Sequence, residues 1–140
     1  MLKYSGNISL IHAKINLAKI NYMVPSIKIK KIAEMLDANV VCGNELVENE
    51  VEYAFASDLM SDVLTLDSEN VVLVTGLTNM QTVRTAEMAD IYCIVFVRGK
   101  KVTPEMIEVA NENNAVLIEC QYSMFKTIGI LNSAGVNPVY

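Results

Sequence analysis

Residues 91–129, IYCIVFVRGKKVTPEMIEVANENNAVLIECQYSMFKTIG, decide the fold because they contain one complete strand, helix, strand, helix unit. The apolar run at 91–97 is rich in β-branched and aromatic residues, as in a strand that is covered on both faces. Thr103 offers a helix N-cap, with Pro104 at the first helical position and Glu105 in the first turn. This order predicts a parallel sheet with right-handed crossovers. The expected buried stripe of the helix is Met106, Ile107, Val109 and Ala110, and the next strand is expected at 115–118.

The rest of the chain adds strands and helices on both sides of this unit. The fold class is therefore α/β: a single three-layer domain, residues 24–140, with a mainly parallel sheet flanked by helices. A basic N-terminal arm, residues 1–23, precedes it. The further strands are expected at 40–41, 51–56 and 70–74, and the further helices at 27–36, directly after residue 57, at 80–89 and at 123–134.

Several side chains are placed to begin or end these helices. Ser26 and Ser57 are candidate N-caps, and the helix after Ser57 would carry Asp58 and Asp62 near its positive end. Gly135 ends the last helix. That helix is expected to turn three apolar residues toward the core, namely Met124, Ile128 and Leu131.

Four blocks of the sequence carry a resemblance to a known family. They are IKKIAEMLDANVVCG (29–43), YAFASDLMSDVLTL (53–66), NVVLVTG (70–76) and RGKKVTPEMIEVANENNAVLIECQYSMFKTIGIL (98–131). Together they cover most of the chain after Met23, and they resemble the DRTGG domain family, small α/β modules of bacteria and archaea. The motifs are mostly structural rather than chemical.

The resemblance implies an accessory or regulatory role. Such domains occur beside phosphotransacetylase catalytic domains, beside CBS pairs in nucleotide-controlled pyrophosphatases, and in ATPase-like proteins, and the domain is similar to a dimerising or ligand-sensing unit. The family tends to carry paired glycines before its ASDL block and after the penultimate strand. This chain instead has Tyr53-Ala54-Phe55-Ala56 and Arg98-Gly99-Lys100 there. Because only glycine lacks a Cβ, the departure bears on any function that needs close backbone approach at these turns.

Length and composition restrict the class of protein further. A chain of 140 residues suggests one domain. No apolar run approaches the roughly 20 residues needed to span a bilayer, so we expect no membrane partner. Cys42, Cys93 and Cys120 have no CxxC spacing and lie in or at the end of apolar strand segments. They are interpreted as buried free thiols of a cytoplasmic protein.

Charge is distributed unevenly along the chain. All six lysines up to Lys31 precede the first acid, Glu34, and the remainder carries five basic and sixteen acidic side chains. Nucleic acid is therefore not an expected partner, because neutralising phosphates requires a basic patch. Two interpretations of the basic arm stay open. It is an amphipathic segment with Ile11, Ile15, Ala18 and Tyr22 at helical spacing, which docks on the domain or on a partner subunit, or it is an extension ahead of a natural start at Met23.

A candidate ligand site follows from the expected sheet. In open α/β sheets, ligands bind beyond the carboxyl ends of the strands, where loop amides and helix N-termini favour anions. A phosphate there would accept hydrogen bonds from Thr78 or Asn79 and the following amides, and Arg98 would supply a bidentate charge. The candidate ligand-binding residues are Ser57, Asp58, Thr75, Gly76, Thr78, Asn79, Arg98, Gly99, Lys100 and Ser123.

The same residues also have a purely structural interpretation. Ser57, Thr78 and Thr103 are ordinary caps, the glycines are turn residues, and Arg98 pairs with a surface carboxylate. Neither GxxxxGK[ST] nor GxGxxG occurs, and we expect no cofactor. His12, in the arm, is the single histidine, which excludes a histidine-based triad or a multi-histidine metal site.

Three functional hypotheses remain. The first is a non-catalytic regulatory or assembly module, a cytoplasmic homodimer that senses a nucleotide or another phosphorylated metabolite and acts on a separate partner enzyme in trans. The second is a small phosphoryl-transfer enzyme or hydrolase in which Asp58 and Asp62, at i, i+4 on one helix face, hold magnesium beside Arg98. The third is an accessory subunit of a redox complex of the hydrogenase type, although no cluster-ligand spacing is present.

Overall fold

A six-stranded sheet forms the middle of the domain in the computed structural model, which describes residues 24–140. All neighbouring strands are parallel except β2 and β7, which pair antiparallel. The α/β prediction with a mainly parallel sheet is therefore confirmed. In spatial order the strands are β2 (Asn39–Cys42), β7 (Val116–Glu119), β6 (Cys93–Phe96), β5 (Val71–Thr75), β4 (Tyr53–Ala56) and β8 (Asn137–Pro138).

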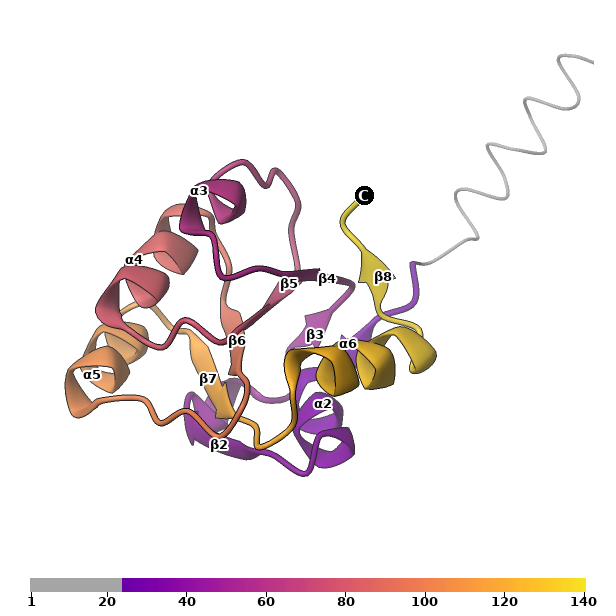
Figure 1. The fold of residues 1–140 in the computed structure, drawn as a ribbon, viewed down its shortest axis with the longest axis horizontal. Helices are drawn as coiled ribbons and strands as arrows, with labels where there is room; N and C mark the ends of the chain where they lie inside the picture. Colours follow the sequence, from indigo (N-terminus) through magenta and orange to yellow (C-terminus); the bar gives the residue numbers. More distant parts are fainter. Residues whose placement is uncertain (1–23) are drawn as a thin grey trace, which may run out of the picture.

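Helices cover both faces of this sheet and create the three layers visible in Figure 1. Side chains alternate between the faces along each strand, as β geometry requires. On β5, Val72 and Val74 pack toward one helical layer, and Val71 and Leu73 pack toward the other. The first layer holds α2 (Ile29–Met35) and α6 (Met124–Ser133), and the second holds α3 (Met60–Val63), α4 (Met80–Met88) and α5 (Pro104–Glu112).

The first helix begins later than the sequence suggests. Ile27 and Lys28 form a short strand, β1 (Ile27–Lys28), which pairs antiparallel with β3 (Glu50–Val51). Helix α2 therefore starts at Ile29, its N-cap position is Lys28, and no side chain caps it. The prediction that Ser26 caps this helix is wrong, because backbone pairing with β3 holds the preceding residues extended. The predicted strand 51–56 is likewise divided at Glu52 into β3 and β4, after the short 3-10 helix η2 (Asn44–Leu46).

The last helix is rotated relative to its predicted orientation. Thr127 is fully buried and Leu131 is nearly so, whereas Ile128 is 38% exposed. These two buried residues are four positions apart and so share the stripe that faces the sheet. Ile128 lies beside that stripe, over the β4–β8 side of the sheet, so its predicted place in the core is wrong. By contrast, α5 agrees with prediction, since the Thr103 hydroxyl accepts a hydrogen bond from Met106 N at 3.3 Å.

Within residues 24–140, five residues other than glycine have a left-handed backbone. Asp37, Asp90 and Asn114 directly follow the C-caps of α2, α4 and α5, and Asn70 directly precedes β5. Aspartate and asparagine tolerate this conformation comparatively well. Arg98, with φ +63°, is the fifth, and a long charged side chain is unusual there.

Within residues 24–140, none of the helices combines the length and the apolar character that a membrane crossing requires. The three cysteines are free and buried, as the sequence predicts.

Candidate functional site

The carboxyl ends of β4, β5, β6 and β7 meet at one edge of the sheet, because these four strands run parallel. We call this the carboxyl edge, and it contains the loops at 57–59, 75–79, 97–103 and 120–123. Helices α4 and α6 begin there at the N-caps Asn79 and Ser123. Free backbone N–H groups at helix N-termini favour anions. The fold therefore brings the predicted loops together.

Asp58 is the centre of the hydrogen bonds at this edge. Its Oδ1 accepts from the Gly76 amide at 2.7 Å and from the Thr75 hydroxyl at 2.9 Å. Its Oδ2 lies 3.8 Å from Arg98 Nη2, in an ion pair whose two side chains are about half exposed. Partial burial by itself would raise the pKa of Asp58, but the donors at Gly76 and Thr75 and the charge of Arg98 outweigh it and hold that pKa below its ordinary value. Asp58 is thus a stable anion.

Arg98 is held by its backbone as well as by its side chain. Its N–H donates to the Tyr122 carbonyl at 2.8 Å, and the Gly99 N–H donates to the Cys120 carbonyl at 2.9 Å. The guanidinium lies against Gly76, so a Cβ on that glycine would overlap it. Gly76 therefore provides the space in which the arginine reaches Asp58.

The candidate residues Thr78, Asn79 and Ser123 all have structural hydrogen bonds. Asn79 Oδ1 accepts from Thr82 N at 3.1 Å, and Ser123 Oγ accepts from Lys126 N at 3.2 Å, so both cap their helices. Thr78 Oγ1 donates to the Gly76 carbonyl at 3.4 Å. No bond joins these three side chains to Arg98 in the described part of the chain. The arginine is grouped instead with Asp58, Thr75 and Gly76.

Ser57 does not cap a helix, contrary to prediction. Its hydroxyl accepts from Leu59 N at 2.9 Å in a tight turn, and α3 begins only at Met60 with Leu59 at the N-cap position. Asp58 therefore precedes the helix, and the predicted i, i+4 pair with Asp62 on one helix face does not form. Within residues 24–140, no group of three or more His, Cys, Asp or Glu side chains is arranged to hold a metal ion.

The sequence analysis missed several residues at the carboxyl edge. Lys126 Nζ lies 3.7 Å from the centroid of the Tyr122 ring. Tyr122 belongs to the loop between β7 and α6, and its carbonyl accepts from the Arg98 amide. Glu119, which is buried, accepts from Val102 N at 2.8 Å and lies 3.4 Å from Lys101 Nζ. Glu119 thereby fixes the basic turn, and Lys101 is occupied in that pair. The cap at Ser123 was a usable signal for Lys126, because it places this lysine in the first turn of α6.

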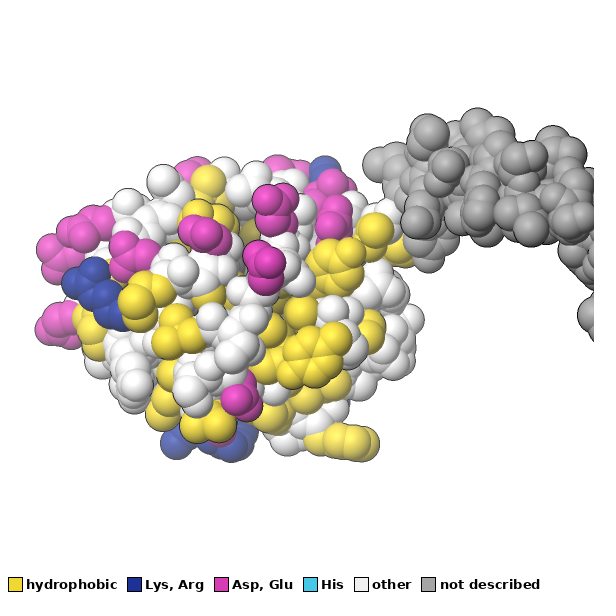
Figure 2. Space-filling model, turned by 90° about the horizontal axis from the view of Figure 1, so that it is seen from above, with side chains coloured by type: hydrophobic (Ala, Val, Ile, Leu, Met, Phe, Trp, Pro, Cys, Tyr) yellow, Lys and Arg dark blue, Asp and Glu magenta, His cyan; other side chains and the backbone are white. Residues whose placement is uncertain are grey.

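Positive charge is concentrated at this edge although the domain is acidic. Residues 24–140 contain eight Lys and Arg side chains against sixteen Asp and Glu. Figure 2 shows one dark blue group at the lower margin and another at the left margin among magenta side chains. Four of the eight basic residues belong to the carboxyl edge or to the first turn of α6: Arg98, Lys100, Lys101 and Lys126.

Comparison with known proteins now gives the family. Residues 31–134 match the DRTGG domain. The chain belongs to the DRTGG domain family. The resemblance inferred from the sequence blocks is thus confirmed.

A solved structure supports the fold of this DRTGG domain. The chain is similar to the CBS and DRTGG domains of the regulatory region of a Clostridium perfringens pyrophosphatase, determined in complex with the activator diadenosine tetraphosphate. The TM-score is 0.62 at 16% identity, and the match covers 80% of this chain but 48% of the other. The DRTGG protein therefore spans about half of that regulatory region. No curated protein matches the sequence.

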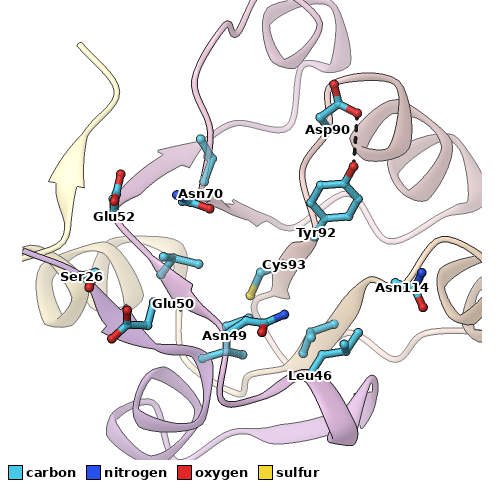
Figure 3. Close-up of a pocket in the computed structure, with 14 residues that line it drawn as sticks. Ser26, Leu46, Asn49, Glu50, Glu52, Asn70, Asp90, Tyr92, Cys93 and Asn114 are labelled. Atoms are coloured by element: carbon cyan, nitrogen blue, oxygen red, sulfur yellow. Dashed lines mark hydrogen bonds between the residues drawn. The ribbon is translucent and has the colours of Figure 1, made fainter. Parts of the chain in front are cut away.

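A hollow of the DRTGG domain lies at the opposite edge of the sheet, where the parallel strands begin (Figure 3). Its volume is about 510 Å³. Tyr92 donates from its hydroxyl to Asp90 Oδ1 at 3.3 Å, and the nearby Asp90 charge raises the pKa of Tyr92. Sequence analysis did not predict this hollow, because its walls come from loops at the amino ends of the strands. The polar lining residues include Ser26, Asn49, Glu50, Glu52, Asn70, Asp90 and Asn114.

Proposed function

We propose that this DRTGG protein is a non-catalytic regulatory module that binds a nucleotide or another phosphorylated metabolite at the carboxyl edge and acts on a separate enzyme. One observation carries the proposal, the left-handed backbone of Arg98. Such a backbone costs about 1–2 kcal/mol in a residue with a Cβ, and glycine avoids that cost. An arginine at this position is best explained by a role for its guanidinium, because strained residues cluster at functional sites.

The surroundings of Arg98 suit an anionic ligand. Its side chain is 48% exposed, so donors remain available beyond the contact with Asp58. A guanidinium binds phosphate oxygens through two parallel hydrogen bonds. Because Asp58 already occupies the Gly76 amide, we assign the phosphate to the side of Arg98 nearer Lys100 and the N-terminus of α6. Three residues of the predicted set then position the arginine: Asp58, Thr75 and Gly76. Four others surround the anion: Arg98, Gly99, Lys100 and Ser123.

A nucleotide, rather than a bare phosphate, is favoured by Tyr122. Its carbonyl accepts from the Arg98 amide, and its ring has Lys126 Nζ 3.7 Å from its centroid. Aromatic rings and cations next to a phosphate-binding arginine provide a surface on which a base stacks. The related pyrophosphatase region was determined with a dinucleotide activator, and diadenosine tetraphosphate is therefore the first ligand to test.

Binding to immobilised or dissolved protein tests this proposal directly. We expect Arg98→Ala to weaken the affinity for diadenosine tetraphosphate at least about tenfold in calorimetry, as loss of charge-assisted hydrogen bonds predicts. Arg84→Ala is the matched control, because Arg84 pairs with Glu87 on α4 and belongs to the other helical layer. Equal affinities in the Arg98→Ala variant and the wild-type protein would remove the carboxyl edge as the site. Inorganic phosphate, titrated in parallel, separates anion binding from nucleotide binding.

We further propose that the module is a homodimer formed through α6 and the β4–β8 side of the sheet. A hollow of about 250 Å³ there is lined by Ala54, Ala56, Val74 and Ile128, and Phe125 at its margin is 88% exposed. β8 pairs with Tyr53 and Ala54 of β4 but does not extend to the other half of that strand. Figure 2, which views the molecule from above relative to Figure 1, shows apolar side chains over the middle of the face that it draws.

Mass in solution tests the dimer. Light scattering should give two chains for the wild-type protein and one chain for Phe125→Asp, since a charge inside an apolar interface is costly. Met88→Asp is the control, because Met88 is 66% exposed but lies on α4, away from this hollow. A wild-type mass of one chain at every concentration would contradict the dimer.

The cellular setting proposed for the module is the cytoplasm. Its three buried free thiols are compatible with a reducing compartment. The partner enzyme in trans should be recovered from cell extract by the immobilised wild-type protein, with recovery that changes on addition of diadenosine tetraphosphate. Recovery that is identical for wild-type and Arg98→Ala protein with and without the dinucleotide would contradict ligand control.

A further inference from the structure

The hollow at the amino end of the sheet has an apolar floor and an acidic rim. Ile29, Val51, Val71 and Val116 contribute to the floor, from helix α2 and three strands. Figure 3 shows side chains from the β3–β4 segment on one side and from the loop before β6 on the other, arranged around the open centre. The acidic rim residues are Glu50, Glu52 and Asp90.

Within residues 24–140, Glu50 has one lysine near it, Lys28, and none of the three carboxylates forms an ion pair. Among the residues that the structure describes, no Lys or Arg lines the hollow. Lys28 lies opposite Glu50 in the β1–β3 pair, but its Nζ forms its ion pair with Glu48, at 2.7 Å. An apolar floor with an acidic rim favours an occupant that is both apolar and basic.

The N-terminal segment of this chain has that character. Residues 1–23 contain Lys3, Lys14, Lys19 and no Asp or Glu, whereas residues 24–140 contain eight basic and sixteen acidic side chains. The segment also has an apolar series at helical spacing, Ile11, Ile15, Ala18 and Tyr22. Its charge and its apolar series therefore complement the rim and the floor of the hollow.

Chain connectivity joins the segment to the domain close to the hollow. Ser26 lines the hollow, and the N-terminal segment ends three residues before it. Lys19 precedes Ser26 by seven residues, which span up to about 25 Å when extended. Both lysines nearest the domain thus have the reach to meet the rim. Attachment to the rim gives the segment a high effective concentration there, which favours its own hollow over that of another molecule.

We propose that the N-terminal segment of this chain, centred on residues 14–22, occupies the hollow of the same molecule, with its apolar residues on the floor and Lys14 and Lys19 at the acidic rim. The hollow is then an intramolecular docking surface at the edge of the sheet opposite Arg98, and it does not depend on ligand binding there.

Zero-length cross-linking of the full chain tests the docking. A carbodiimide joins a lysine Nζ to a carboxylate as an amide with loss of water, and only groups in contact react. We expect peptides that link Lys14 or Lys19 to Glu50, Glu52 or Asp90, at a yield comparable to that of the Lys28–Glu48 link. The latter pair, 2.7 Å apart, is the internal standard. In an equal mixture of ¹⁴N- and ¹⁵N-labelled protein, the two peptides of each link should carry the same label, because both come from one chain.

A matched pair of variants separates specific docking from general attraction to an acidic surface. Ile15→Ser combined with Tyr22→Ser retains every charge and should lower the yield of the links about tenfold, as loss of apolar burial predicts. His12→Ser, on the same segment, should leave the yield of the links unchanged. Three results would overturn the proposal: no links at the rim, links spread equally over exposed carboxylates such as Glu45 and Glu108, or links between differently labelled chains.

Discussion

At the carboxyl edge of the sheet, Arg98 lies between Asp58 and the N-terminus of α6, whereas at the amino edge Glu50, Glu52 and Asp90 face a hollow without a cation of the described chain. The two edges also use the left-handed backbone differently. At the amino edge, Asn70, Asp90 and Asn114 adopt it where helix-to-strand turns require it, and their short polar side chains tolerate it. At the carboxyl edge a long arginine adopts it. Turn geometry thus explains the left-handed residues at the amino edge. At the carboxyl edge, turn geometry does not explain why the left-handed residue is an arginine, so its side chain must have a role.

The largest effect on this comparison is expected from Gly76→Ala. The added Cβ would overlap the Arg98 guanidinium, which must move away from Asp58. We expect the affinity for diadenosine tetraphosphate to fall at least about tenfold in calorimetry, since an ångström-scale displacement of a binding group loses its hydrogen bonds. Gly129→Ala is the control, because a Cβ there meets nothing within 4 Å. Unchanged binding in Gly76→Ala would show that the position of the guanidinium does not matter.

A smaller effect is expected from Asp58→Asn, and it should depend on pH. The hydrogen bonds and the arginine charge lower the pKa of Asp58, against the effect of its partial burial, so the anion stabilises the folded protein at pH values above the unfolded pKa of about 3.8. That contribution is lost as the pH falls through the lower folded pKa. Because the pair is about half exposed, we expect about 1 kcal/mol or less.

Urea denaturation between pH 2 and pH 7 checks this prediction. The wild-type protein should be more stable than Asp58→Asn near pH 7, and the difference should vanish at the acidic end. Asp62→Asn, on α3, is the control. A difference that grows toward low pH would contradict the assignment of Asp58 as a stabilising anion. If the wild-type protein had phosphatase activity in an assay, retention of that activity by Asp58→Asn would exclude a catalytic role for this residue.

The smallest effect is expected at the thiols. Burial raises the pKa of Cys93 to about 12, and burial together with the charge of Glu45 raises the pKa of Cys42. Although Cys93 lines the amino-edge hollow, it is 1% exposed. We therefore expect no reaction of Cys93 with a thiol reagent at pH 8 in the native protein, and full reaction in urea. Rapid native labelling of Cys93 would show that the hollow opens to the level of the strand.

Periodicity and capping signals predicted most of the fold. The Thr103-Pro104 start of α5 and the apolar strands around it are present, because local propensity and burial agree there. The antiparallel pairing of β2 with β7, and the extended Ile27 and Lys28 beside β3, were not predictable, because they depend on partners distant in the sequence. The misplacement of Ile128 has the same origin. Its side of α6 covers the margin of the sheet, which the helix sequence does not reveal.

Less of the site was predictable from the sequence. The rule that loops meet at the carboxyl ends of parallel strands correctly grouped Asp58, Thr75, Gly76 and Arg98. The structural interpretation predicted that Arg98 pairs with a carboxylate, and the structure contains that pair, with 3.8 Å between Arg98 Nη2 and Asp58 Oδ2. The left-handed φ of Arg98 was not predictable, since the backbone angle follows from bonds to Tyr122 and Cys120 on the neighbouring strand loop.

The variant Arg98→Gly tests the central claim most directly, with unfolding free energy and affinity for diadenosine tetraphosphate measured on the same preparation. Glycine removes the backbone strain and the guanidinium together. The account predicts a protein at least as stable as the wild type, by up to about 1 kcal/mol, that binds the dinucleotide at least about tenfold more weakly. A protein that is clearly less stable and binds with unchanged affinity would contradict the account, because Arg98 would then serve only the fold.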